Sequence, residues 1–348
     1  MSMTPLFGHQ ELRDRLNSAI ATDRLPQVLL LTGPSGVGKQ RLALWLAQRL
    51  LCERGLPEPC GECGACRRTL DLVHPDLHWF VPVPRPKAGD ADKQVEEVAE
   101  SLEAALADRR AGGQWGSPDG MASHGIASAR LLQRRAGLTA AEGGWRVFVV
   151  GHAERLVPQE SSPEAANALL KLLEEPPARA LFLLTAPEAG LVLTTIRSRA
   201  VPVRVGRLAD ADVRAWAAAA GVATDELAIR AAGGAIGRLG RGGADPQGGA
   251  ARRVLEAVDG GPAARARAAL GQGVSQARGD FTALLDALAV ELAEQARSAS
   301  AGGRWPAAGR AAAGVELVLE TRERAQGNVN PQLALAVLMD DLAALEAA

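Results

Sequence analysis

The four cysteines of the chain lie within one short stretch. Cys52, Cys60, Cys63 and Cys66 give the spacing C-x₇-C-x₂-C-x₂-C, and glycines in the segment CGECGAC let a loop curl around one ion. Four thiolates at such spacing are typical of a tetrahedral structural zinc site, whose closed coordination sphere leaves no position for chemistry. Two alternatives stay open: scattered thiols, and an iron–sulfur cluster, although no Cys-Pro follows the cysteines. We expect one structural zinc ion.

A glycine-rich loop follows the first apolar run. It reads GPSGVGKQ and fits the phosphate-binding P-loop up to its last position. In that loop the backbone N–H groups surround a phosphate, and the lysine reaches the β- and γ-phosphates. The last position normally carries Ser or Thr, whose hydroxyl binds Mg²⁺, but here it is Gln. We therefore expect a P-loop fold with only a remnant of a nucleotide site. The remnant consists of Gly33, Gly36, Gly38, Lys39 and Gln40.

The second half of an ATPase site is also incomplete. The apolar strand 147–150 should be followed by a Mg²⁺-binding aspartate and a catalytic glutamate, but Gly151 and His152 stand there. We interpret His152 as a surface or loop histidine, because no acidic neighbour there would hold Mg²⁺. Glu154 is interpreted as an exposed helix residue. Thr185, at the end of another apolar strand, is expected to face the nucleotide pocket. No ATP hydrolysis is expected from the chain alone.

Two further motifs carry charge. The segment 167–177 (NALLKLLEEPP) predicts a helix ended by two prolines, with Glu174 and Glu175 at its carboxyl end. The helix dipole disfavours anions there, so the glutamates indicate either a partner surface or an ordinary solvated helix end. Ser198 and Arg199 precede the next strand, where an arginine could point out of the subunit, although exposed arginines are common.

Short apolar runs alternate with helical patterns through the first half of the chain. The runs are 26–33, 76–81, 145–150, 180–186 and 200–205. This alternation predicts an α/β fold with a mostly parallel sheet. After Arg207 the strand patterns stop. Short helices are expected over 208–240, and from 249 onward about five helices should form an all-α bundle.

Residues 84–125 interrupt the alternation. Val95, Val98, Leu102 and Leu106 give the middle of the segment one amphipathic helix, whereas its flanks have the composition of a loop. We interpret the segment as an insertion that proteases cut first. Deletion of residues 86–120 is expected to leave assembly intact.

Length and composition limit the function classes. A chain of 348 residues exceeds one comfortable core, so two or three domains are expected. A net charge of -1 excludes a uniformly basic nucleic-acid surface, so any DNA contact must be local. Charged residues interrupt every apolar stretch, and the start of the chain lacks the apolar core of a signal peptide. We expect a cytoplasmic protein with reduced cysteines.

Taken together, these motifs resemble bacterial DNA polymerase III clamp-loader subunits of the AAA+ family. GPSGVGK, CGECGAC, NALLKLLEEPP and IRSRA occur in the same order there, and the segment 327–342 resembles the last helix of the collar domain. Two subunit types share this layout. The ATP-hydrolysing gamma/tau type has GKT and two acidic residues in place of Gln40, Gly151 and His152. Those departures, and HPDL at 74–77, resemble the delta-prime type.

The resemblance implies three domains. Residues 1–207 would form an AAA+ P-loop domain with a zinc knuckle (52–66) and the insertion (84–125). Residues 208–245 would form a small helical lid domain, and residues 246–348 a C-terminal helical collar domain.

The resemblance also implies a function. A delta-prime subunit would be a non-catalytic part of the ring that loads the sliding clamp on primed DNA. Its partners would be the gamma/tau and delta subunits, and it would meet the clamp and primer–template DNA through the complex, with no membrane contact. Arg199, with Ser198, would complete an ATP site in trans as an arginine finger. Ala200 stands where the family pattern has cysteine, which we expect to alter local packing only.

Two other functions remain as alternatives. One is a gamma/tau-type motor with a degenerate but working site. The other is a free-standing zinc-dependent nucleic-acid module, which the near-neutral charge and the few aromatic residues disfavour.

Overall fold

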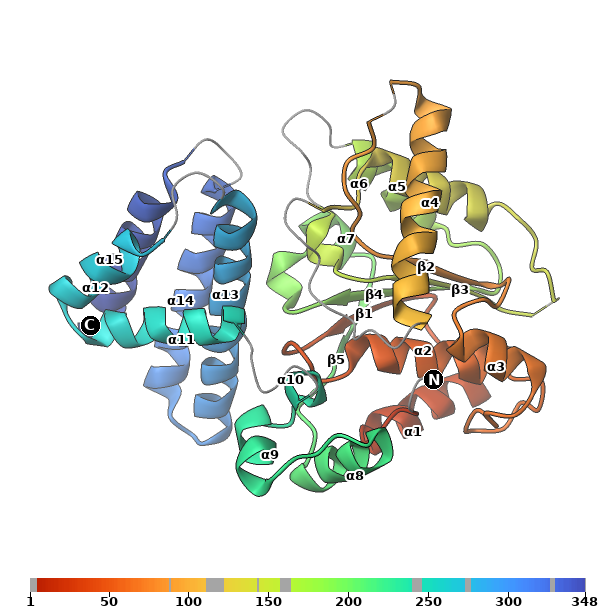
Figure 1. Ribbon diagram of the computed structural model, residues 1–348, viewed down its shortest axis with the longest axis horizontal. Coiled ribbons are helices and arrows are strands. Elements are labelled where there is room, and N and C mark those ends of the chain that lie inside the picture. Colours follow the sequence, from red (N-terminus) through yellow and green to blue (C-terminus); the bar gives the residue numbers. More distant parts are fainter. Residues whose placement is uncertain are drawn as a thin grey trace. The chain divides into compact units, whose positions relative to one another are not determined.

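The computed structural model divides near residue 243 into two compact units (Figure 1). The structure describes residues 5–87, 89–110, 122–142, 144–156, 164–239, 246–272, 277–325 and 329–347. The three-domain division expected from the sequence stays a prediction. In the described part of the chain, no helix is long and apolar enough to cross a membrane.

The first unit is built on a parallel sheet of five strands, in the order β2-β3-β4-β1-β5. The strands are β1 (Val28–Thr32), β2 (Leu77–Phe80), β3 (Arg146–Val150), β4 (Ala180–Ala186) and β5 (Val201–Arg204). Each lies within one of the apolar runs, which confirms the α/β fold. The three central strands are buried along their whole length, whereas β5 lies at an edge and is mostly exposed. A parallel sheet covered on both faces requires such continuous apolar strands.

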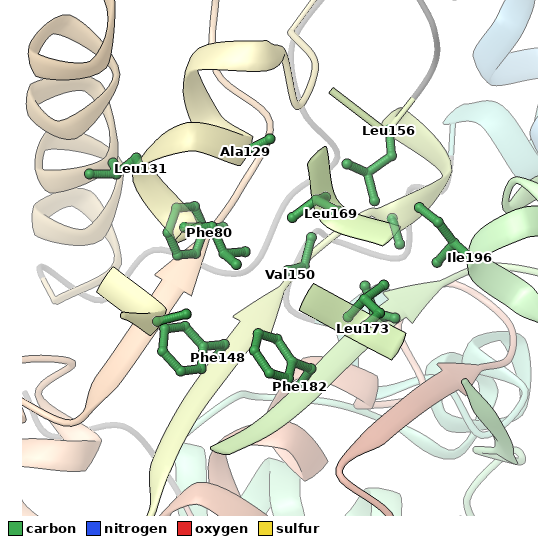
Figure 2. Close-up of a cluster of buried hydrophobic side chains, with 14 of the residues drawn as sticks. Phe80, Ala129, Leu131, Phe148, Val150, Leu156, Leu169, Leu173, Phe182 and Ile196 are labelled. Atoms are coloured by element: carbon green, nitrogen blue, oxygen red, sulfur yellow. The ribbon is translucent and has the colours of Figure 1, made fainter. Parts of the chain in front are cut away.

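Alternate residues of the strands point to opposite faces of the sheet, and helices cover both faces (Figure 1). One face packs under α4 (Ala91–Arg110), α5 (Ile126–Ala136), α6 (Glu164–Glu174) and α7 (Thr194–Arg197). The other face packs against α1 (Gln10–Ala21) and α2 (Lys39–Leu51). Helix α3 (Gly64–Leu70) packs against α2. Figure 2 shows the first core, where Phe148 stacks on Phe182 with ring centroids 4.9 Å apart. The two packed faces hold the strands in place, and the candidate site lies at their carboxyl ends.

Helix α4 confirms the amphipathic helix expected in the segment 84–125. Val95, Val98, Leu102 and Leu106 are all buried, and the first three belong to the core that contains Phe80. Helix α4 is therefore part of the core. Deletion of residues 86–120 would remove these core residues, and the expectation that the segment is a dispensable insertion stays a prediction. Its flank 111–121 lies outside the described residues.

The two ends of this segment are also tied together. Val83 and Ser123 form an isolated antiparallel bridge, in which each backbone N–H donates to the other's carbonyl at 3.2 and 3.0 Å. The residues before and after α4 therefore lie next to each other, although they are far apart in the sequence.

The remaining elements are helical. Two 3₁₀ turns, η1 (Ala153–Arg155) and η2 (Ala189–Leu191), follow β3 and β4. Helices α8 (Asp210–Ala220), α9 (Glu226–Ala232) and α10 (Ile236–Leu239) share a small apolar core. The described residues of the second unit form α11 (Pro246–Asp259), α12 (Pro262–Leu270), α13 (Ala277–Ala301), α14 (Trp305–Arg324) and α15 (Pro331–Ala347). The expected helical bundle is confirmed there. A buried ion pair between Asp286 and Arg322, 2.5 Å apart, joins α13 to α14.

Candidate functional site

The four cysteines form one cluster. Their Sγ atoms all lie within 4.8 Å of one another, with Cys52 3.7 Å from Cys60 and Cys60 3.9 Å from Cys66. A tetrahedron of thiolates around zinc, with Zn–S bonds of about 2.3 Å, has S···S edges of about 3.8 Å. The cluster therefore fits the metal expected from the spacing. These cysteines could hold a structural metal such as zinc.

Backbone N–H groups of the cluster donate hydrogen bonds to cysteine sulfurs and thereby stabilise the thiolate form. The N–H of Cys63 donates to Sγ of Cys60, and that of Cys66 donates to Sγ of Cys63, each at 3.4 Å. Hydrogen bonds from the backbone of Cys63 and Glu62 lower the pKa of Cys60 to about 6. Burial instead raises the pKa of the Cys66 thiol. A cation among the four sulfurs would favour the thiolate of each.

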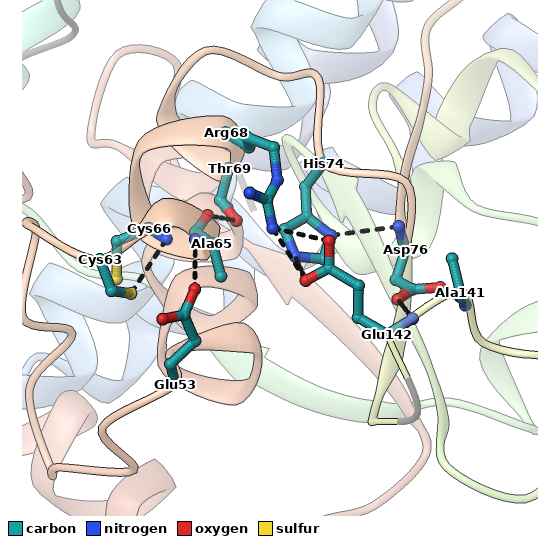
Figure 3. Close-up of polar contacts among 10 residues, drawn as sticks. All are labelled: Glu53, Cys63, Ala65, Cys66, Arg68, Thr69, His74, Asp76, Ala141 and Glu142. Carbon is teal, nitrogen blue, oxygen red and sulfur yellow. Dashed lines mark hydrogen bonds and ion pairs between the residues drawn. The ribbon is translucent and has the colours of Figure 1, made fainter.

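The loop that carries the cysteines is fixed to its neighbours. Gln48 of α2 donates to the carbonyl of Cys66 at 3.1 Å. Glu53 accepts from the N–H of Ala65 at 3.0 Å (Figure 3). Glu58 accepts from the indole of Trp45 at 2.9 Å. The cluster thus lies where α2 ends and α3 begins, and it joins these two helices.

The HPDL motif at 74–77 has a structural role in this arrangement. Asp76 is buried and accepts from the backbone N–H groups of Ala141 and Glu142 at 2.7 and 3.0 Å (Figure 3). The carboxylate of Glu142 lies 3.3 Å from Nε2 of His74 and accepts from Arg68 of α3 at 2.6 and 2.8 Å. The motif therefore connects the helix after the cysteines to the loop before β3.

The P-loop adopts the strand–loop–helix geometry expected from its sequence. It joins β1 to α2, and Gly33, Gly36 and Gly38 have φ values of 148°, 83° and 100°. A side chain at Gly33 would collide with the carbonyl of Val205, since a Cβ there would lie 2.1 Å from its oxygen. Two neighbours close over the loop from outside. The N–H of Gly237 in α10 donates to the Gly36 carbonyl at 3.0 Å, and Nε2 of His9 lies 2.8 Å from the Val37 carbonyl.

Lys39 is turned back onto its own loop. Its Nζ donates to the carbonyls of Gly33 and Pro34 at 2.6 and 2.9 Å. Burial lowers the pKa of Lys39 to about 8, although the charges of Glu154 and Glu188 act in the opposite direction. The lysine that would reach a phosphate is therefore held by the protein itself.

Gln40 and Gly151 fit one another. A Cβ built on Gly151 would lie 3.3 Å from Nε2 of Gln40, so the glutamine amide fills the space beside the missing side chain. Oε1 of Gln40 is buried and has no hydrogen-bond partner among the described residues. The two departures from an active ATPase site therefore form one contact. The side chains that normally hold Mg²⁺ are replaced by an amide packed against a glycine.

Glu154 is a functional-site residue that the sequence did not reveal, and the expectation of an exposed helix residue is wrong. Only 4% of Glu154 is exposed, and its Oε1 lies 3.0 Å from Nδ1 of His152. Burial raises the pKa of this carboxyl, whereas the neighbouring His152 and the charge of Lys39 lower it. The lowering effects are the larger, so the pKa of Glu154 lies below its usual value. A glutamate four residues past a strand matches no motif. Its burial is seen only in the folded structure, in the 3₁₀ turn after β3.

Other groups surround this carboxylate. The backbone N–H of His152 donates to the hydroxyl of Thr185 at 3.2 Å, which places Thr185 beside the loop after β3, and its role in a nucleotide pocket stays a prediction. Nε2 of His124 lies 2.7 Å from the carbonyl of Gly151, to which it donates. Burial lowers the pKa of His124 to about 4, so this ring is neutral at pH 7. No pattern in the sequence predicts His124 at this place, because it belongs to the segment interpreted as an insertion.

Arg199 lies away from the buried remnant, at the surface. Its Nε donates to Oε1 of Glu174 at 2.8 Å, and Nη2 bonds the same oxygen. Its Nη1 donates to the Thr195 carbonyl at 2.6 Å and to the hydroxyl of Ser198 at 3.2 Å. A shallow surface hollow is lined by Leu173, Glu174, Ser198 and Arg199. The structure thus brings together the end of α6 and the Ser-Arg motif, which the sequence analysis treated separately.

Ala200, the departure beside this arginine, is buried and belongs to the core beneath α7.

Comparison with known proteins gives a family match. A family model described as "DNA polymerase III, delta subunit" matches residues 8–209. The chain is 29% identical over 184 residues to DNA polymerase III subunit delta' of Bacillus subtilis, covering 53% of this chain and 43% of that protein. It is 33% identical over 180 residues to the subunit delta' of Yersinia pestis, covering 51% and 41%.

A second subunit type also matches. The subunit gamma/tau of Mycobacterium tuberculosis strain H37Rv is 30% identical over 200 residues, or 57% of this chain and 27% of that protein. The matches therefore span less than half of each of these three relatives.

Proposed function

Since this chain belongs to the DNA polymerase III delta-prime subunit family of AAA+ clamp loader relatives, we propose that it is a clamp loader subunit that does not hydrolyse ATP itself. It would assemble with gamma/tau and delta subunits into the ring that loads the sliding clamp on primed DNA. Its own contribution to ATP hydrolysis would be Arg199, supplied to a neighbouring subunit.

The contact between Gln40 and Gly151 carries this proposal. Hydrolysis of a nucleoside triphosphate needs a bound Mg²⁺ ion and a residue that orients the attacking water. An amide packed on a glycine provides neither, and the carboxylate of Glu154 is occupied with His152. The ammonium group of Lys39 is hydrogen-bonded to carbonyls of its own loop and does not extend toward a phosphate position. These contacts support a site that does not turn over.

Arg199 supports the second half of the proposal. It lies at the surface with 28% of its side chain exposed, two residues before the edge strand β5. A guanidinium has the planar, fixed geometry that matches a phosphate group, and it stays charged at all physiological pH values. An arginine supplied in trans to a phosphoryl transfer raises its rate by about 10³–10⁵. Ser198 would help to orient it through its hydroxyl.

The cysteine cluster would hold zinc in a structural role. Four protein sulfurs close the coordination sphere, so a metal there would fix the ends of α2 and α3 and would take no part in hydrolysis.

The gamma/tau-type motor is the competing function, because a relative of that type matches 57% of this chain. Gln40 and Gly151 oppose it, since the first has an amide in place of the Mg²⁺-binding hydroxyl and the second has no side chain in place of the carboxylate.

Reconstituted loader separates the two functions. The wild-type chain and its variants would be assembled with gamma/tau and delta subunits, and ATP hydrolysis measured with clamp and primed DNA. We expect no phosphate release from the chain alone, a large loss of loader activity for Arg199→Ala, and a small change for Lys39→Ala. Arg197→Ala is the matched control, because Arg197 is exposed in α7 and its side chain has no described partner. Loss of loader activity with Lys39→Ala but not with Arg199→Ala would favour the motor instead.

A further inference from the structure

The guanidinium of Arg199 is almost completely used within its own chain. It has five N–H donors, and four of them are engaged: Nε and Nη2 with Glu174, and Nη1 with Thr195 and Ser198. Only one N–H on Nη2 is left among the described contacts. A phosphate is bound best by two parallel N–H groups of one guanidinium. Arg199 cannot offer such a pair to another molecule while all four contacts hold.

Glu174 is the charged partner among these contacts, and its place in the chain is unfavourable. It is the last residue of α6, where unpaired carbonyls give the helix end negative potential. Glu175 follows it with the same charge and is exposed, but its side chain has no partner among the described residues. Arg199 therefore compensates one of two adjacent carboxylates, and it does so across 25 residues of sequence.

The pair does little for the stability of the fold. The Arg199 side chain is 28% exposed and that of Glu174 is 48% exposed. Ion pairs with such exposure are screened by solvent and contribute little to folding. The same exposure makes the pair easy to exchange, because an incoming anion can reach the guanidinium without opening the core.

We propose that Glu174 is a latch that holds Arg199 against its own subunit until a phosphate of the neighbouring subunit's nucleotide displaces it. This inference rests on the proposed function of Arg199 and names the residue that regulates it. The carboxylate competes with the phosphate for the same Nε and Nη2 donors, and its negative charge opposes a phosphate that approaches the hollow. Docking of the neighbour exchanges one anion for another. Glu174 thus acts through Arg199 and does not touch the nucleotide.

The substitution Glu174→Gln tests the latch in reconstituted loader, because it keeps the shape and removes the charge. We expect the concentration of this subunit that gives half-maximal loader ATPase activity to fall roughly 1.5- to 5-fold, the range that exposed ion pairs span. The difference from wild type should shrink as salt is raised, because salt screens the charge that Glu174 presents. Glu174→Asp keeps the charge and should behave more like wild type.

Two controls make the result decisive. Glu175→Gln changes the same charge at the adjacent, unpartnered position and should leave the half-maximal concentration unchanged. In an Arg199→Ala background, Glu174→Gln should have no further effect, because the latch then holds nothing.

The outcomes separate the latch from the function it serves. If Arg199→Ala abolishes loader activity but Glu174→Gln raises the half-maximal concentration or leaves it unchanged, the latch is wrong and the arginine finger stands. If Arg199→Ala leaves loader activity intact, the finger itself is refuted, and the latch with it. An equal effect of Glu175→Gln would reduce the result to general surface charge and overturn the specific role of Glu174.

Discussion

Leu102 tests whether the segment 84–125 belongs to the core. The side chain is 1% exposed and lies in α4 within the cluster that contains Phe80. Leu102→Ala would remove three buried carbon atoms and leave a cavity, because the sheet beneath α4 cannot collapse into the space. Such substitutions cost about 2–5 kcal/mol of unfolding free energy. For a unit of this size each kcal/mol lowers Tm by about 2–4 °C, so a fall of about 4–20 °C is expected.

Thermal and urea unfolding, followed by circular dichroism, would measure the loss. Glu100→Ala is the control, since Glu100 is exposed on the same helix and its substitution should change stability by no more than about 0.5 kcal/mol. Deletion of residues 86–120 should lower the yield of folded protein for the same reason. A loss below about 1 kcal/mol for Leu102→Ala would show that α4 is not part of the core. The interpretation as a dispensable insertion would then be supported.

Other predictions concern the metal, a buried histidine and the second unit. Cys63→Ser should reduce bound zinc from one ion per chain to none, as measured by metal analysis of protein prepared without chelators; iron, or no metal in the wild type, would contradict the site. Since burial lowers the pKa of His124 from 6.5 to about 4, the unfolded chain binds a proton between those pH values that the folded chain does not, and stability falls as pH falls. His124→Gln should abolish up to about 3 kcal/mol of that loss, seen in urea midpoints at pH 7 and 4.5; parallel pH profiles would refute the assignment. Asp286→Ala should destabilise the second unit by about 3–5 kcal/mol because it removes the carboxylate that pairs with the buried guanidinium of Arg322, and Asp286→Ala with Arg322→Met should recover much of the loss in urea unfolding.

Elements with a local pattern could be predicted from the sequence. The five apolar runs became the strands of the sheet, and GPSGVGK became a loop between a strand and a helix. The cysteine spacing predicted a cluster of four sulfurs. Each of these depends on residues that are close together in the chain, where periodicity and spacing carry the information.

Contacts between distant segments could not be predicted in this way. The burial of Glu154 could not be predicted because nothing near it in sequence shows that its carboxylate packs against His152 inside the protein. Glu174 and Arg199 each belong to a motif of the sequence, but no local pattern shows that the end of α6 lies beside Arg199. His124 was overlooked because a single histidine in an irregular segment has no pattern.

The close fit of Gln40 and Gly151 has a consequence for the history of this chain. An aspartate placed at 151 alone would crowd the glutamine amide, whose Nε2 lies 3.3 Å from the position of its Cβ, so the Gln40 side chain would have to shift. A threonine restored at 40 alone would leave an empty space and still lack the second metal ligand. Neighbouring substitutions of this kind are not additive, so each single reversion is harmful or useless without the other. If the chain works as proposed, without hydrolysing ATP itself, a functioning metal site could therefore be rebuilt only by changing both positions together.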